Sequence, residues 1–100
     1  MNAARQKVED EGECRVCGEP ADRCDAAHTW DRGTAGGNFT EPALVVPLCS
    51  KIKGGAGCHD LYDAHKLDLL PYLRLDEQVA MVKAAGGIER ARKRVIGRGL

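Results

Sequence analysis

The sequence contains few aromatic residues and no long apolar segment. Only 4% of its 100 residues are aromatic, so the hydrophobic core that it can build is small. No apolar run approaches the roughly 18 residues that a transmembrane helix requires, and we expect no membrane span. The chain also does not begin with a basic segment followed by an apolar stretch. We therefore expect no secretory signal and a cytoplasmic location.

The sequence has no net charge, because 15 basic side chains balance 15 acidic ones. The two signs are nevertheless unevenly distributed. Residues 1–50 hold nine acidic and five basic side chains, whereas residues 51–100 hold six acidic and ten basic. Basic residues gather near the C-terminus at Arg90, Arg92, Lys93, Arg94 and Arg98. This asymmetry fits either a polyanionic partner or the solvated face of a helix.

Cysteine is abundant for a chain of this length. Of the five cysteines, four form two pairs with the spacing C-x2-C and C-x8-C: Cys14, Cys17, Cys49 and Cys58. Zinc prefers four tetrahedral ligands, and thiolates bind it at about 2.3 Å. A CxxC turn followed by Gly18 directs two sulfurs toward one point. We therefore predict one structural Zn²⁺ that joins the N-terminal segment to the middle of the chain.

Two other uses of these cysteines compete with zinc. A redox CxxC requires a strand-to-helix βαβ context that the sequence does not show. Disulfides require an oxidising compartment, which the expected location does not provide. The fifth cysteine, Cys24, lies within a predicted strand, and we interpret it as a small buried apolar residue.

Hydrophobic periodicity and chain breakers give a coarse order of elements. The first 12 residues are expected to be helical or frayed. Two strands are predicted, at 23–30 and 43–48, separated by a glycine-rich loop. A flexible KIKGGAG segment is expected at 51–57, and a helix is predicted to begin at Cys58 and to break near Pro71.

Two further helices are predicted in the last quarter of the chain. Asp76 is the expected N-cap of a helix over 77–85. Its apolar stripe comprises Val79, Val82 and Ala85, and Gly86 and Gly87 end it. The last helix, over 88–96, carries the basic residues.

The three histidines occupy contrasting positions. His59 follows Cys58 at the start of a predicted helix, and Asp63 lies four residues further on the same face. This pair could hold a hard divalent ion. His65 would project roughly 120° away from His59 on that helix, so it is less suited to share the ion. His28 ends the first predicted strand, a position that by itself favours a packed core histidine over a catalytic one.

The order of these features resembles the zinc-containing HNH endonucleases, which have the ββα-metal fold. The segments that carry the resemblance are CRVCG (14–18), DAAHTWDRGTAGG (25–37), VVPLC (45–49) and GCHDLYDAH (57–65). Together they fall within residues 14–65, about half of the chain. The run LDLLPYL (67–73) also resembles the segment after the motif in small phage and actinobacterial HNH proteins.

The resemblance implies roles for several residues. His28 matches the general base that activates the attacking water, and His59 matches the histidine ligand of the catalytic ion, expected to be Mg²⁺ or Mn²⁺. The four paired cysteines match the structural zinc ligands. Ala27 stands where family members usually have an Asp or His ligand. Basic residues expected to contact DNA phosphates are Arg32, Lys51, Lys53, Arg92, Lys93 and Arg94.

We therefore expect one α+β domain over residues 1–100, with a zinc-stapled ββα-metal, treble-clef-like core at 14–66. Additional helices are expected at 67–100. The expected activity is metal-dependent hydrolysis of DNA phosphodiester bonds. A single site cuts one strand, so cleavage of both strands implies a homodimer or a partner protein. The alternative is a non-catalytic zinc module that binds nucleic acid or protein, which would need neither His28 nor His59.

Overall fold

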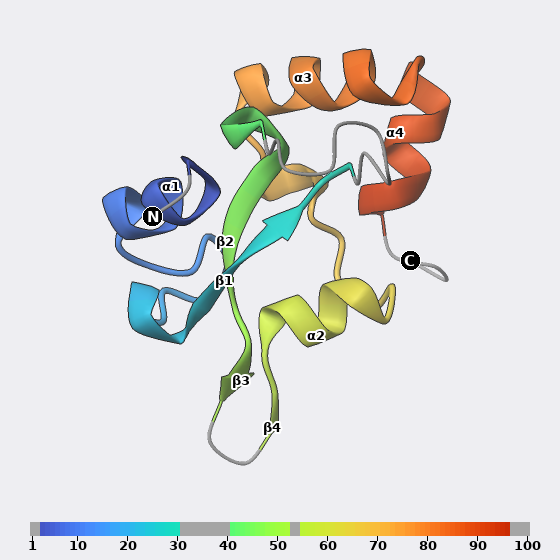
Figure 1. Ribbon diagram of the computed structural model, residues 1–100. Helices are drawn as coiled ribbons and strands as arrows, with labels where there is room; N and C mark the ends of the chain where they lie inside the picture. The colour runs from blue at the N-terminus through green and yellow to red at the C-terminus, as the bar shows by residue number, and fades with distance from the viewer. Residues whose placement is uncertain (1–2, 31–40, 53–54, 97–100) are drawn as a thin grey trace.

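The computed structural model describes residues 3–30, 41–52 and 55–96 and shows a small α+β fold (Figure 1). The helices are α1 (Ala3–Glu11), α2 (Cys58–Asp63), α3 (Leu75–Ala85) and α4 (Ile88–Val95). The strands are β1 (Cys24–His28), β2 (Val45–Cys49), β3 (Lys51–Ile52) and β4 (Gly55–Ala56). Three 3-10 turns complete the described elements: η1 (Ala21–Arg23), η2 (Pro42–Leu44) and η3 (Leu70–Tyr72). Among these residues, no helix is both long and apolar enough to cross a membrane.

The centre of the fold is the antiparallel pair β1 and β2, which confirms the two main predicted strands. Their register places Cys24 opposite Cys49 and His28 opposite Val45. Every residue of β2 is buried, because α1 packs against both strands and α2 also contacts β2 (Figure 1). A strand covered in this way has a continuous apolar run, which is the pattern VVPLC.

The predicted flexible segment after Cys49 is instead a short hairpin. β3 and β4 pair in antiparallel register, with Lys51 opposite Ala56 and Ile52 opposite Gly55. Gly55, one of the glycines that marked this segment as flexible, thus belongs to a paired strand. The hairpin leaves the end of β2 and returns the chain to the start of α2 (Figure 1).

The helix predicted from Cys58 to the vicinity of Pro71 is wrong in length. α2 ends at Asp63, and the backbone turns into the left-handed region at His65, with φ of 61°. That conformation cannot continue a right-handed helix. The leucines that follow therefore reach the core from irregular backbone and from η3, not from a helix. Among them, Leu69 is fully buried. His65 consequently lies beyond α2, and not on that helix at roughly 120° from His59 as predicted.

α3 begins earlier than predicted, and its buried face only partly matches the predicted stripe, because Ala85 is buried and Val82 packs against the core. Its N-cap is Arg74, so Asp76 lies within the first turn. The buried residues are Glu77, Met81 and Ala85, whereas Val79 of the predicted stripe is 45% exposed. Gly86 ends the helix in the left-handed conformation, with φ of 80°, as predicted. The final helix is confirmed as α4, which buries Ala91 and Val95.

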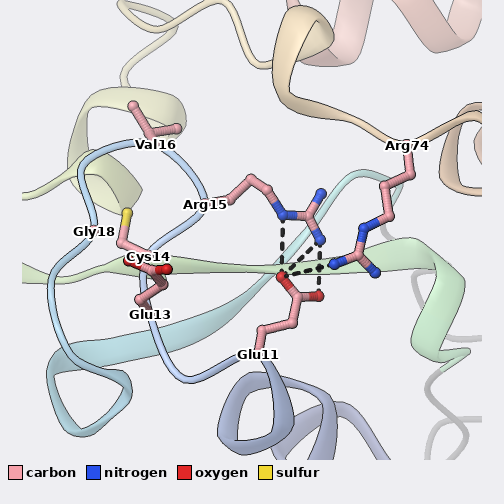
Figure 2. A pocket seen from close by; sticks show the side chains of 7 residues that line it. All are labelled: Glu11, Glu13, Cys14, Arg15, Val16, Gly18 and Arg74. Carbon is pink, nitrogen blue, oxygen red and sulfur yellow. Dashed lines mark hydrogen bonds and ion pairs between the residues drawn. The ribbon is translucent and has the colours of Figure 1, made fainter.

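The buried face of α3 includes a carboxylate, that of Glu77. Glu77 is fully buried, and its two oxygens each lie 2.7 Å from a cation, Nζ of Lys7 and Nη1 of Arg15. Arg15 also pairs with Glu11 at 2.8 Å, and Arg74 approaches the same carboxylate at 3.6 Å (Figure 2). This network ties α1, the CxxC turn and α3 together. Burial opposes ionisation of Glu77, but the hydrogen bonds from Arg15 and Lys7 prevail and lower its pKa to about 2.

Candidate metal centre and adjoining histidine site

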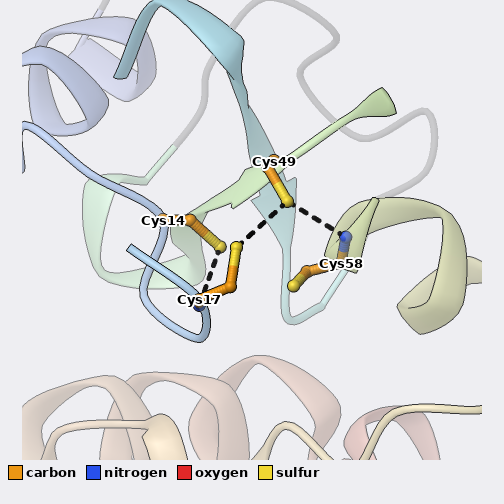
Figure 3. A group of neighbouring side chains, drawn as sticks. All are labelled: Cys14, Cys17, Cys49 and Cys58. Atoms are coloured by element: carbon orange, nitrogen blue, oxygen red, sulfur yellow. Dashed lines mark hydrogen bonds between the residues drawn. The ribbon is translucent and has the colours of Figure 1, made fainter. Parts of the chain in front are cut away.

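The four paired cysteines meet at one point. The sulfur atoms of Cys14, Cys17, Cys49 and Cys58 all lie within 4.8 Å of one another (Figure 3). Four sulfurs at about 2.3 Å from a tetrahedral zinc ion are separated by roughly 3.8 Å, and Sγ of Cys17 and Cys49 are 3.4 Å apart. The cluster therefore has the ligand type, number and spacing of a structural metal site such as zinc, as the sequence predicted.

The first two sulfurs are presented by a tight turn. The amide of Gly18 donates to the carbonyl of Cys14 at 3.1 Å, and Gly18 adopts a φ of 82°, which favours glycine. Within the turn, the amide of Cys17 faces Sγ of Cys14 at 3.5 Å. The amide of Arg15 donates to the carbonyl of Pro47 at 2.8 Å. This last bond fixes the turn against β2.

The other two sulfurs are brought together by the hairpin. Cys49 ends β2 and Cys58 begins α2, and the amide of Cys58 donates to Sγ of Cys49 at 3.2 Å. Four of the eight intervening residues form β3 and β4. Gly57 is required here because a Cβ at this position would lie 1.4 Å from the carbonyl oxygen of Ser50. The C-x8-C spacing thus corresponds to an antiparallel hairpin inserted between the two cysteines.

The thiols of the cluster differ in how readily they ionise. Burial raises the pKa of Cys14, but amide hydrogen bonds from Cys17, Cys49 and Val16 outweigh burial and bring the pKa down to about 7. Burial raises the pKa of Cys49 and of Cys58 above the ordinary thiol value. Thiolates gathered this closely need a compensating cation, and a divalent metal such as zinc would supply it.

Cys24 lies beside the cluster but is not part of it. The side chain is 2% exposed, as the sequence predicted, and its Sγ lies 3.5 and 3.4 Å from the carbonyl oxygens of Glu19 and Pro20. A thiol that donates to carbonyls keeps its proton. Burial, together with the neighbouring cysteines, raises the pKa of Cys24 to about 12.

His28 occupies the end of β1, as predicted, and its backbone is held firmly. The hydroxyl of Tyr62, a fully buried residue of α2, donates to the carbonyl of His28 at 2.6 Å. Next to it, the amide of Thr29 donates to the carbonyl of Leu44 at 2.8 Å. In the described part of the chain, the half-buried imidazole of His28 makes no hydrogen bond or ion pair.

His59 lies between two carboxylates. Its Nε2 is 3.5 Å from Oδ2 of Asp63, so the predicted i,i+4 pair is close in space. Its Nδ1 is 2.9 Å from Oδ2 of Asp25, which projects from β1. Both aspartates are more than half exposed, whereas the His59 side chain is 25% exposed. The sequence analysis gave Asp25 no role, although the segment DAAHTWDRGTAGG begins with it, because nothing local shows that it meets His59.

The predicted DNA contacts are only partly described. Arg92 and Lys93 are exposed on α4, whereas the guanidinium of Arg94 lies 4.5 Å from the centre of the Tyr62 ring. Lys51 belongs to β3, but its side chain, like Arg32 and Lys53, lies outside the described residues. Arg94 therefore has a packing role on the residue that holds His28.

Two groups of predicted site residues are thus brought together: the four cysteines, and the pair His59 and Asp63. His28 is linked to the second group through its backbone contact with Tyr62 of α2. Comparisons of this chain with protein-family models, with curated proteins and with solved structures found no match.

Proposed function

We propose that this protein is a metal-dependent DNA endonuclease of the HNH type, built on a ββα-metal core that a structural zinc ion stabilises. The observation that carries the proposal is the bond between Tyr62 and the carbonyl of His28. It draws the end of β1 against α2, the helix that begins at the cysteine cluster and carries His59. The order strand, strand, helix thereby places one histidine on a strand and another on the helix beside it.

The proposed chemistry needs a base and a cation. Imidazole is the side chain best suited to accept a proton near neutral pH, and we assign this role to His28 because no other group engages it in the described structure. His28 takes the proton from a water molecule, whose oxygen attacks the phosphorus, and the 3′-oxygen leaves. A divalent cation, when bound, neutralises charge on the phosphate and on the leaving oxygen.

His59 and Asp63 are the residues that would hold this cation. They offer one imidazole nitrogen and one carboxylate oxygen, and their open setting leaves room for water and a phosphate oxygen as further ligands. Mg²⁺ and Mn²⁺ accept such mixed sets and keep several waters. The structural zinc would take no part in the reaction, because the four thiolates fill its coordination sphere.

DNA binding is proposed to use the basic second half of the chain. Arg92 and Lys93 are exposed on α4, and lysines and arginines of this kind bind phosphates without reading sequence. One site per chain implies nicking of one strand. Cleavage of both strands would then require a second copy or a partner protein.

Nicking of supercoiled plasmid by the zinc-loaded protein tests the proposal. We expect nicked circles with Mg²⁺ or Mn²⁺ and none when these ions are omitted. His28→Ala should slow nicking about 10²- to 10⁴-fold, the usual contribution of a general base. His65→Asn is the matched control, because it removes another imidazole while an asparagine tolerates the left-handed backbone. Failure of the wild type to nick under any divalent ion would favour the non-catalytic zinc module.

A further inference from the structure

The contact between Asp25 and His59 joins residues 34 positions apart in the sequence. Asp25 lies near the start of β1, opposite Leu48 of β2, and His59 lies in the first turn of α2. The contact is therefore made by the packing of α2 beside the strand pair. At 2.9 Å, Nδ1 and Oδ2 are separated by the usual length of an N–H to oxygen hydrogen bond.

The chemistry of the two groups decides the direction of this bond. An ionised carboxylate can only accept, and a neutral imidazole carries its proton on one nitrogen. With the proton on Nδ1, His59 donates to Asp25 and its Nε2 keeps a free lone pair. With the proton on Nε2, the lone pair of Nδ1 would face a carboxylate oxygen at 2.9 Å, which is repulsive. The first tautomer is therefore favoured.

The other ring nitrogen of His59, Nε2, faces the carboxylate of Asp63. Nε2 and Oδ2 of Asp63 are 3.5 Å apart, too long for a strong hydrogen bond. Two ligands at about 2.1 Å from one cation are separated by roughly 3.0 to 3.4 Å, depending on the ligand angle. The observed separation is close to that range. Nε2 and Asp63 are thus arranged as two neighbouring ligands of one ion, while Nδ1 is already engaged.

We propose that Asp25 is a positioning residue, whose carboxylate accepts the Nδ1 proton of His59 and fixes the imidazole so that Nε2, with Asp63, binds the catalytic divalent cation. This role rests on the proposed function. A carboxylate behind a ligand histidine fixes its tautomer and ring orientation and raises its basicity as a ligand. Asp25 thereby supports the ion without touching it.

Two measurements on the zinc-loaded protein test this assignment without relying on cleavage. The first is the nitrogen NMR spectrum of the His59 ring at a pH where the ring is neutral. We expect a protonated Nδ1 and an unprotonated Nε2 in the wild type, and a shift toward the other tautomer in Asp25→Ala. Asp25→Asn retains an acceptor oxygen and should retain the wild-type tautomer.

The second measurement is the affinity for Mn²⁺, followed by the loss of its free EPR signal. Asp25→Ala should weaken Mn²⁺ binding about 10- to 100-fold, the usual effect of removing such a supporting carboxylate. Asp25→Asn should weaken Mn²⁺ binding less than Asp25→Ala does. Asp22→Ala is the matched control, because it removes an exposed carboxylate from the adjoining η1 turn and should leave the affinity unchanged. Bound zinc, measured in every variant, verifies that each one is folded.

Several outcomes would overturn the assignment. These are an unprotonated Nδ1 in the wild type, an affinity of Asp25→Ala within twofold of the wild type, or no Mn²⁺ binding by the wild type. Loss of the Nδ1 proton on binding the diamagnetic ion Mg²⁺ would also overturn it, because Nδ1 and Asp25 would then both be ligands. Failure of the wild type to cleave DNA would refute the proposed function alone, since neither readout involves DNA.

Discussion

Neutralising the buried carboxylate of Glu77 should destabilise the fold by several kilocalories per mole. The pKa of Glu77 is lowered from 4.5 to about 2, and each pH unit corresponds to about 1.4 kcal/mol. Ionisation of this group in the folded protein therefore contributes about 3 kcal/mol to the free energy of unfolding at neutral pH. Glu77→Gln removes the charge and leaves Lys7 and Arg15 without their shared partner. Loss of one member of a buried ion pair costs a similar amount, about 3 to 5 kcal/mol.

The sign of the pH dependence is set by the lowered pKa. Above about pH 5, Glu77 is ionised in both the folded and the unfolded chain, so the deficit of Glu77→Gln should stay constant from there to pH 8. As the pH falls from 4.5 toward 2, the unfolded chain binds the proton first. The contribution of Glu77 to wild-type stability is then lost. The free energies of unfolding of the wild type and of Glu77→Gln should therefore become similar.

Urea unfolding at saturating zinc measures this difference. We expect Glu77→Gln to lose about 3 kcal/mol at pH 7, which for a domain of this size lowers Tm by more than about 12 °C. The control is Glu9→Gln, which breaks the solvent-exposed pair with Arg5 and should cost less than about 1 kcal/mol. A loss for Glu77→Gln below about 1 kcal/mol, or equal to that of the control, would refute the reasoning.

Two further predictions concern the zinc cluster and the basic helix. Cys17→Ser, at an exposed ligand position, should abolish zinc binding and folding, because structural zinc contributes about 10 to 16 kcal/mol of apparent binding free energy. Cys24→Ser should retain one zinc per chain by elemental analysis, and zinc-free folded wild type would contradict both expectations. Joint replacement of Arg92 and Lys93 by glutamine should weaken binding to all DNA sequences and reduce the salt-dependence slope by about 2. An unchanged slope, equal to that of the Lys83→Gln control, would show that α4 is only a solvated surface.

The cysteine cluster and the main strands were predictable because each depends on local signals. A CxxC turn with a following glycine and an apolar run such as VVPLC are readable over a few residues. The hairpin between Cys49 and Cys58 was not predictable, because its glycines are equally compatible with a flexible loop. The end of α2 was missed because nothing in the sequence marks His65 as left-handed. The apolar spacing beyond it therefore suggested continued helix.

The contacts that the sequence could not reveal join distant segments. Glu77 lies 70 residues from Lys7 and 62 from Arg15, and a glutamate in a helix ordinarily faces solvent. Asp25 reaches His59 only after β1, β2 and α2 have packed together. In both cases a charged residue gains its role from tertiary structure. Local patterns assign such residues to the surface or give no sign of them.

The most direct test of the proposed activity compares the defects of His28→Ala and His59→Ala in DNA cleavage and in metal binding. Rates of plasmid nicking and affinities for Mn²⁺ are measured on the same zinc-loaded preparations. His28→Ala should bind Mn²⁺ nearly as the wild type does and nick about 10²- to 10⁴-fold more slowly, with a residual rate that rises with pH as hydroxide replaces the base. His59→Ala should lose Mn²⁺ affinity and recover part of its rate at higher ion concentration. Loss of ion binding in His28→Ala with retention in His59→Ala would reverse the two roles and contradict the account.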